Sequence, residues 1–358
     1  MLKGIVMKIS VCIIVKNESE TVERCLESVK PFADEIIVAD TGSVDDTKAK
    51  ARKFTDKIYD FKWINDFSAA RNHAFEKATS DYLFWLDADD VIDTESALKI
   101  AALKTEKNIY DTYMFRYAVA FDKNGLPTFE YYRERLMKNC AAARFKGFVH
   151  EAVAPFGKIV YRDDITIEHR KLKSGDPTRN LRMYEEYIAS GKTLDARGEY
   201  YYAKELFYNR RYADAKRGLQ KYLSGGAGFL PDVKDAYKTI YKCDALRCLS
   251  ADEKNLTDAL AACGADSEIF CYLGDARLRR GDFTCATAYY KCALCVDKPS
   301  PESGFYESKF YYIEPLLRLV FAYYDNGDKK TAAVFHDLCL KNYPEADEVV
   351  FNSRFFEK

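Results

Sequence analysis

The sequence predicts an α/β domain followed by an all-α domain of helical repeats. Two observations carry this prediction. Short apolar runs rich in β-branched residues alternate with helical patterns in the first half, which is typical of a mostly parallel sheet covered by helices. The second half is almost entirely helical in pattern and repeats a pair of helices. The 358 residues allow two domains of ordinary size, which we expect at residues 1–173 and 174–358.

Three buried strands and one short strand, Lys57–Asp60, are expected early in the α/β domain. They are Ile9–Val15, Glu35–Ala39, Lys57–Asp60 and Tyr82–Leu86. Helical patterns separate them, at Ser19–Val29, Thr47–Phe54 and Ser68–Ala78. In parallel sheets ligands bind beyond the carboxyl ends of the strands. Asp40 and Asp87 each follow a buried strand directly, so both are expected at that edge.

Residues 110–170 have a less regular pattern, which we interpret as the part that completes the first domain. The strand candidates here are Tyr113–Phe121, Arg135–Met137, Phe148–Val153 and Ile165–Ile167. A turn is expected at Lys123–Gly125, and Lys171–Pro177 is the expected linker. Residues 1–6 are expected to be a loose extension.

The second half contains copies of a two-helix unit. The clearest copy, residues 269–299, has Gly274, Ala286 and Tyr290 at spacings that match the tetratricopeptide pattern. Residues 316–344 and 200–223 repeat the pattern, and a degenerate unit fits at 233–263. Three or four such units suffice to bury a common core.

Composition restricts the class of protein. The formal net charge of −1 gives no electrostatic sign of binding to nucleic acid or an anionic membrane. The N-terminus lacks the long apolar region of a signal peptide, and no apolar run is long enough to span a membrane. We therefore expect a cytoplasmic chain with reduced thiols. Of the 11 cysteines, Cys292 and Cys295 form a CxxC pair, which could indicate zinc but favours small hydrophobic packing residues.

The stretch FWLDADD, Phe84–Asp90, places three carboxylates after an apolar run. Asp87 and Asp89 flank one residue and could converge on Mg²⁺ or Mn²⁺, which oxygen ligands suit. Alternatively, the acids form a solvated turn or cap a helix that begins near Thr94.

Three segments make the metal interpretation stronger. They read SVCIIVKNESETVERCLESV, EIIVADTGSVDDT and DFSAARNHAFEKATSDYLFWLDADD. In this order and spacing they resemble the nucleotide-sugar-binding half of the family 2 glycosyltransferases over about residues 8–170. The resemblance implies the GT-A fold, a mixed sheet with flanking helices. The family's turn usually reads GSTDGT, and Val44 and Asp46 depart from it.

The resemblance also implies which residues bind the nucleotide. Val15, Asn17 and Glu18, in the loop after the first strand, would hold the base and ribose. Asp40 would accept a hydrogen bond from a base N–H such as that of uracil. Arg71 would lie near the nucleotide, with a surface ion pair as the alternative.

The same resemblance implies a metal site. Asp89 would bind Mn²⁺ or Mg²⁺ directly, Asp87 would face both ribose and metal, and Asp90 would support them or cap a helix. His169 would be a third metal ligand, with a surface histidine as the alternative. The metal would bridge the diphosphate of the donor and stabilise it as a leaving group.

The segment FKGFVHEAV offers the acceptor side. It resembles the G-x-V-H-E segment of relatives with helical repeats, so Glu151 is the candidate base, with His150 as an alternative or an acceptor contact. On a strand the two side chains would point to opposite faces. Arg135 resembles an arginine that lines the acceptor side of the nucleotide-sugar site.

We therefore expect a metal-dependent, inverting hexosyltransferase that uses a UDP-sugar. The plan resembles the bacterial sublancin-type enzymes that glycosylate Cys or Ser of peptides, so the expected acceptor is a Cys or Ser/Thr side chain of a peptide or protein held by the repeats. The alternatives are a transferase for cell-envelope glycans, or a tetratricopeptide adaptor with an inactive transferase domain. An exposed repeat end could also form a homodimer.

Overall fold

The computed structural model describes residues 7–123, 125, 127–173, 175–226, 228–247, 253–299 and 306–356. The chain divides into two compact units, Met1–Lys192 and Thr193–Lys358. The expected extension at residues 1–6, and Asn124 and Ser174 in the expected turn and linker, lie outside the described residues.

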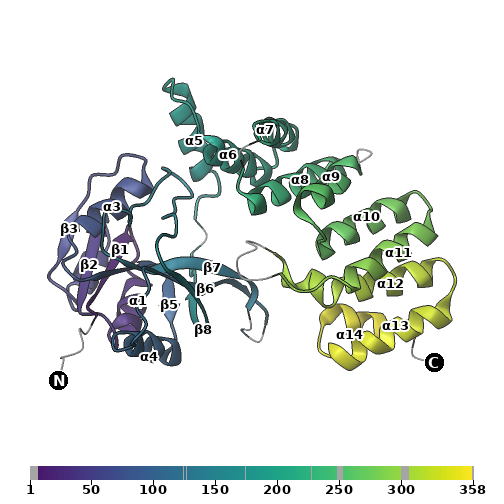
Figure 1. Cartoon of the computed structure of the whole chain (residues 1–358), viewed down its shortest axis with the longest axis horizontal. Coiled ribbons are helices and arrows are strands. Elements are labelled where there is room, and N and C mark those ends of the chain that lie inside the picture. Colours follow the sequence, from purple (N-terminus) through teal and green to yellow (C-terminus); the bar gives the residue numbers. More distant parts are fainter. Residues whose placement is uncertain are drawn as a thin grey trace. The chain divides into compact units, whose positions relative to one another are not determined.

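The first unit is built on one mixed sheet of eight strands in the order β3-β2-β1-β4-β7-β6-β8-β5 (Figure 1). The strands are β1 (Ile9–Val15), β2 (Glu35–Asp40), β3 (Ile58–Asp60), β4 (Tyr82–Asp87), β5 (Asp90–Ile92), β6 (Thr112–Phe121), β7 (Pro127–Lys138) and β8 (Ile159–His169). The four strands from β3 to β4 are parallel. β7 joins β4 in the antiparallel sense, which makes the sheet mixed as the resemblance implied.

Helices cover both faces of the parallel part. They are α1 (Val22–Val29), α2 (Thr47–Ala51), α3 (Phe67–Glu76) and α4 (Thr94–Leu103). On β1, Val11 and Ile13 pack in one core with Leu26 of α1, whereas Cys12 packs in a second core with Phe75 of α3. Successive side chains of a strand point to opposite faces, so a strand buried on both faces is apolar at nearly every position. This explains the sequence of β1, in which only Ser10 is polar.

The structure contains one strand that was not expected and lacks one that was expected. β5 was not expected, because it is three residues long and begins with an acid. The expected strand at Phe148–Val153 is wrong: only an isolated bridge joins Lys146 to Ala152. The backbone turns at Gly147 and at His150, where φ is 91° and 52°, values that no β-strand adopts.

Helix α5 (Arg179–Ala189) belongs to the first unit, so the division between the units follows Lys192 rather than residue 173. Its buried Tyr184 and its Tyr187 contact the ring of Phe148. The expected boundary at 173/174 stays a prediction about where independently folding domains divide.

The second unit is a row of antiparallel helix pairs. The helices are α6 (Ala196–Tyr208), α7 (Tyr212–Ser224), α8 (Leu230–Leu246), α9 (Lys254–Cys263), α10 (Ser267–Arg279), α11 (Phe283–Leu294), α12 (Glu314–Asp325), α13 (Lys329–Asn342) and α14 (Asp347–Ser353), with a short 3₁₀ helix η2 (Ser308–Tyr311) before α12. A Cβ on Gly274 of α10 would lie 2.3 Å from the ring of Tyr290 of α11, so this pair needs a glycine to pack closely. The predicted tetratricopeptide-like repeats are confirmed.

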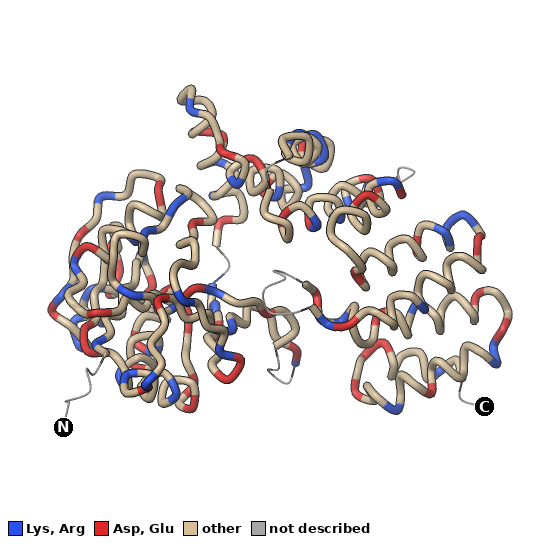
Figure 2. The backbone as a smooth tube through the Cα atoms, viewed as in Figure 1, with Lys and Arg blue, Asp and Glu red and all other residues tan. Residues whose placement is uncertain are grey.

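Basic and acidic residues are interleaved along both units (Figure 2), in keeping with the near-zero net charge. The ten cysteines for which the structure gives a state are free thiols. Cys292 and Cys295 are exposed, so neither is a buried packing residue, and neither belongs to a potential metal-ligand group within the described ranges. None of the helices described is both long and apolar enough to cross a membrane.

Candidate functional site

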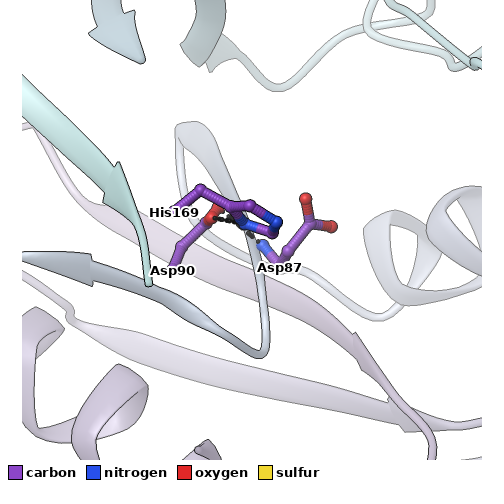
Figure 3. A group of neighbouring side chains, drawn as sticks. All are labelled: Asp87, Asp90 and His169. Carbon is purple, nitrogen blue, oxygen red and sulfur yellow. Dashed lines mark hydrogen bonds and ion pairs between the residues drawn. The ribbon is translucent and has the colours of Figure 1, made fainter. Parts of the chain in front are cut away.

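Three potential metal ligands gather at the carboxyl end of β4. Oxygen or nitrogen atoms of Asp87, Asp90 and His169 all lie within 4.8 Å of one another (Figure 3). Asp87 ends β4, and Asp90 begins β5 after a two-residue turn. β5 pairs with β8 in a register that sets Asp90 opposite His169. This pairing places His169, which lies 79 residues further along the chain, beside Asp90.

Asp90 is the fully buried member of the group, with no exposed surface. Its Oδ1 accepts from the Tyr117 hydroxyl at 3.0 Å and lies 3.0 Å from Nδ1 of His169. Its Oδ2 accepts from the backbone N–H of Asp87 at 3.0 Å and from Arg135 at 3.1 Å. Asp90 was expected either to support the neighbouring acids or to cap a helix, and these contacts fit the supporting role.

The helix-cap role expected for these acids belongs to another residue. α4 does begin at Thr94, but the carboxylate of Asp93 accepts from the backbone N–H of Ser96 at 2.7 Å.

Asp89 lies in the turn between β4 and β5 and is partly exposed. Its Oδ1 is 3.4 Å from Nδ1 of His169. Burial of the carboxyl, together with the charges of Asp87 and Asp90, raises the pKa of Asp89 to about 6, against the effect of His169. The pKa of His169 is raised as well: burial opposes this, but Asp90 and Asp89 favour the charged ring. Because the carboxylate of Asp89 is poorly neutralised by its neighbours, it favours the binding of a cation.

Arg71 lies between the acids and the candidate base. Its guanidinium donates to Oδ1 of Asp87 and, from Nε at 2.6 Å, to Oε1 of Glu151. Its side chain is only 8% exposed and packs on the ring of Trp85, so the alternative of a surface ion pair is wrong. Although burial of Asp87 opposes ionisation, the charge of Arg71 lowers the pKa of that carboxyl. One guanidinium thus donates hydrogen bonds to two acids.

Hydrogen bonds join the loop after β1 to the turn after β2, and together they form one wall of the candidate site. The backbone N–H of Asn17 donates to Ser43 Oγ at 2.9 Å, and that of Glu18 donates to Thr47 Oγ1 at 2.7 Å. In return, Asn17 Oδ1 accepts from the N–H of Val44 at 2.9 Å. These contacts join the loop that the resemblance assigned to the nucleotide to the turn that follows Asp40.

Asp40 holds its own turn in place. Its carboxylate accepts from the backbone N–H groups of Gly42 and Ser43 and lies 3.4 Å from Nζ of Lys48. Asp40 is 1% exposed and Val15 is 2% exposed. Their contacts with a base or ribose stay predictions, and Asp40 would have to share its oxygens with the turn.

The loop that carries His150 and Glu151 is attached to α3. Asn72 of α3 exchanges two hydrogen bonds with the backbone of Phe145, at 2.9 and 3.0 Å. The backbone N–H of Phe67 donates to the carbonyl of Phe148 at 2.9 Å. Glu151 therefore reaches Arg71 from a fixed loop rather than from a strand.

Helix α5 also packs against this loop. The ring of Tyr187 stacks on that of Phe148 with centroids 4.3 Å apart, and Tyr184 meets the same ring edge-on at 4.9 Å. The amide of Asn65 donates to Glu186 at 3.0 Å. Sequence reasoning missed this role of α5, although the paired tyrosines of MYEEYI lie three positions apart on one helix face.

Arg135 does not line the acceptor side. It is fully buried beneath the acids, where its guanidinium is sandwiched between Trp85, at 3.8 Å, and Tyr117, at 4.1 Å. It pairs with Asp90 and donates to the carbonyl of Trp85. The prediction is corrected because a side chain with no exposed surface cannot touch a substrate.

Comparisons with known proteins agree with this geometry. Residues 10–170 match the family model described as glycosyl transferase family 2. The match to the family 2 glycosyltransferase domain covers less than half of the chain. The SPbeta prophage-derived glycosyltransferase SunS of Bacillus subtilis is 33% identical over 195 residues, which cover 49% of this chain and 44% of that one.

Two other similarities are more limited. A TPR repeat-containing protein of Synechococcus elongatus is 47% identical over 89 residues, covering 25% of this chain and 22% of that protein. The chain thus spans less than half the length of these curated relatives. S. aureus TarS 1-349, crystallised with UDP-GlcNAc, is 14% identical over 79% of this chain and 90% of that one, with a TM-score of 0.37, too low to support an argument.

The donor set fits a hard divalent cation. Carboxylate oxygens with one imidazole suit Mn²⁺ or Mg²⁺ rather than a thiophilic ion. The group brought together by the structure contains Asp90 in addition to the expected Asp87 and His169, whereas Asp89 is not a member of it and lies 3.4 Å from Nδ1 of His169. Asp89 and His169 are both partly exposed, so a cation can reach them.

Proposed function

We propose that the chain is a metal-dependent, inverting glycosyltransferase that moves a hexose from a UDP-sugar to a Cys or Ser/Thr side chain of a peptide or protein. One observation carries the proposal. Within a family 2 glycosyltransferase domain, Asp87, Asp90 and His169 meet at the carboxyl edge of the sheet, with Asp89 beside His169.

The donor belongs at the same edge. The wall formed by Asn17, Glu18 and the turn after β2 would hold the nucleoside, and Asp87 and Asp89 would face its diphosphate. A bound Mn²⁺ or Mg²⁺ would supply Lewis-acid stabilisation of the departing diphosphate. Arg71, held by Asp87 and Glu151, fixes a guanidinium at the same edge.

Glu151 is the proposed base. Arg71 holds Oε1, which leaves Oε2 to take the proton of the acceptor thiol or hydroxyl. The acceptor sulfur or oxygen then bonds to the anomeric carbon from the face opposite the leaving group. The bond from that carbon to the diphosphate oxygen breaks, and UDP leaves with the electron pair. A thiol, with a pKa near 8.5, needs less help from the base than a hydroxyl.

The repeat unit supports a peptide or protein acceptor. Rows of paired helices bury a common core and present extended surfaces that proteins use to bind other proteins. A homodimer, and the cytoplasmic location expected from the sequence, stay predictions.

Hydrolysis of a panel of UDP-sugars in the presence of Mn²⁺ tests the proposal. We expect slow release of UDP from one of them, and loss of that release in Asp89→Ala. Glu268→Gln, which alters an acid in the repeat unit, is the matched control and should retain the activity. If no UDP-sugar is turned over and UDP with Mn²⁺ does not raise the melting temperature, the chain is an adaptor with an inactive domain.

A further inference from the structure

We propose that Asp90 is a positioning residue: when the ring of His169 is neutral, Asp90 holds its proton on Nδ1 and so keeps Nε2 available for the metal. The inference rests on the metal site of the proposed function. It assigns to Asp90 a task distinct from ligation, although its oxygens lie within ligand distance of the others.

Hydrogen bonds occupy every lone-pair position of the Asp90 carboxylate. An ionised carboxylate offers about four lone-pair positions. Two donors reach Oδ2, namely the N–H of Asp87 and the guanidinium of Arg135. Tyr117 and Nδ1 of His169 reach Oδ1, both at 3.0 Å. With all four positions filled and no exposed surface, Asp90 has no lone pair left for a cation.

The same contacts determine the tautomer of His169. Oδ1 of Asp90 can only accept, so the neutral ring must present an N–H at Nδ1. Nε2 then carries the lone pair, and this atom is the one that can bind a metal. The register of β5 with β8 fixes the position of the ring, because His169 is the direct cross-strand neighbour of Asp90 (Figure 3).

Replacement of Asp90 by asparagine should reverse the tautomer. The two donors at the Oδ2 position cannot accept, so the amide oxygen must stay with them. The amide NH₂ then faces Nδ1 of His169, which has to accept. The proton moves to Nε2, and the lone pair that would bind the metal is lost.

Nitrogen NMR of ¹⁵N-histidine-labelled full-length chain, in alkaline buffer without metal, tests the tautomer. His169→Gln assigns the signal among the four histidines. We expect protonated Nδ1 in the wild type and in Tyr117→Phe, which keeps the carboxylate, and protonated Nε2 in Asp90→Asn. Protonated Nε2 in the wild type would overturn the proposal. An Nδ1 proton that persists in Asp90→Asn would also overturn it, since Asp89 would then be the group that holds this proton. If Asp90→Asn does not fold, the wild type and Tyr117→Phe decide.

Titration with Mn²⁺ tests whether Asp90 acts only through His169. Asp90→Asn should weaken Mn²⁺ binding about tenfold to hundredfold, the usual effect of losing such a partner of a ligand. The double variant Asp90→Asn/His169→Ala should bind Mn²⁺ as His169→Ala does. A further loss in the double variant would show that Asp90 is itself a ligand. A wild type that binds no Mn²⁺ would contradict the metal site of the proposed function, while the tautomer result would stand.

Discussion

Both units of the chain bury charged side chains, but they neutralise them differently. In the repeat unit, Lys238 of α8 pairs with Glu268 of α10 at 2.5 Å, and both side chains are almost fully buried. Burial opposes ionisation of Glu268, but Lys238 and Lys242 lower its pKa to about 2. In the sheet unit the pKa of Asp89 rises to about 6. A buried acid that is paired with lysines therefore joins helices, whereas a buried acid that is poorly neutralised can hold a cation.

Asp232 of α8 limits this lesson. Burial also raises the pKa of Asp232 to about 6, although it lies in the repeat unit. Throughout the described ranges, however, it belongs to no group of potential metal ligands, whereas Asp89 lies beside His169 at the edge where three such residues gather. A raised pKa is informative only where other ligands converge.

The largest effect is expected from Glu151→Gln. Loss of a general base slows transfer by about 10²- to 10⁴-fold. The loss should be smaller for a Cys acceptor than for a Ser acceptor, since a thiol ionises more easily. Transfer rates with matched Cys and Ser peptides measure the contrast, and the affinity for UDP with Mn²⁺ is the control. An equally large loss with both peptides would contradict the contrast.

The next effect concerns the stability of the repeat unit. Glu268→Ala leaves Lys238 buried without its partner, which costs about 3–5 kcal/mol. Urea unfolding followed by circular dichroism measures this. The double variant Lys238→Met/Glu268→Leu should recover most of the loss, because it removes both charges. A single variant as stable as the wild type would show that the pair is unimportant.

Acid should weaken the repeat unit in a defined range of pH. The pKa of Glu268 is about 2 in the folded chain and 4.5 as its ordinary value. A lowered folded pKa stabilises the chain above pH 4.5, and this contribution is lost as the pH falls from 4.5 towards 2. The loss amounts to about 3 kcal/mol. Urea unfolding at a series of pH values measures it, and a Glu268→Gln chain with the same pH dependence would refute the assignment.

Tyr187→Ala should have the smallest effect. The stacked ring on Phe148 contributes about 0.5–1.5 kcal/mol beyond the area that it buries. Its loss should loosen the loop of Glu151, so that kcat for transfer falls several-fold while the affinity for UDP with Mn²⁺ is unchanged. Tyr187→Phe keeps the ring and is the control. If kcat is equal in both variants and the wild type, α5 does not position the loop.

The sequence predicted what depends on local pattern. β1, β2 and β4 were expected because each is a continuous apolar run, and the helix pairs of the repeats because of their small and aromatic residues. β5 was not predicted, since an acid such as Asp90 at the start of a segment normally indicates an exposed position. Asp90 is buried only because it meets Tyr117, Arg135 and His169, which lie 27, 45 and 79 residues away.

The candidate site shows the same limit. The acids after β4 were expected at the sheet edge, but the contact of Arg71 with Glu151 joins residues 80 positions apart. Arg135 was assigned to the acceptor from local resemblance, and only the packing on Trp85 and Tyr117 shows that it is buried. Tertiary contacts of this kind leave no short-range trace in a single sequence.

Binding of Mn²⁺ in the presence of UDP tests the central claim most directly. We predict that calorimetric titration finds one Mn²⁺ per wild-type chain, that Asp89→Ala and His169→Ala each weaken binding at least about tenfold, and that Glu268→Gln binds as the wild type does. Asp89→Ala and His169→Ala chains that bind Mn²⁺ as tightly as the wild type would contradict the claim that the acids after β4 and His169 form the metal site.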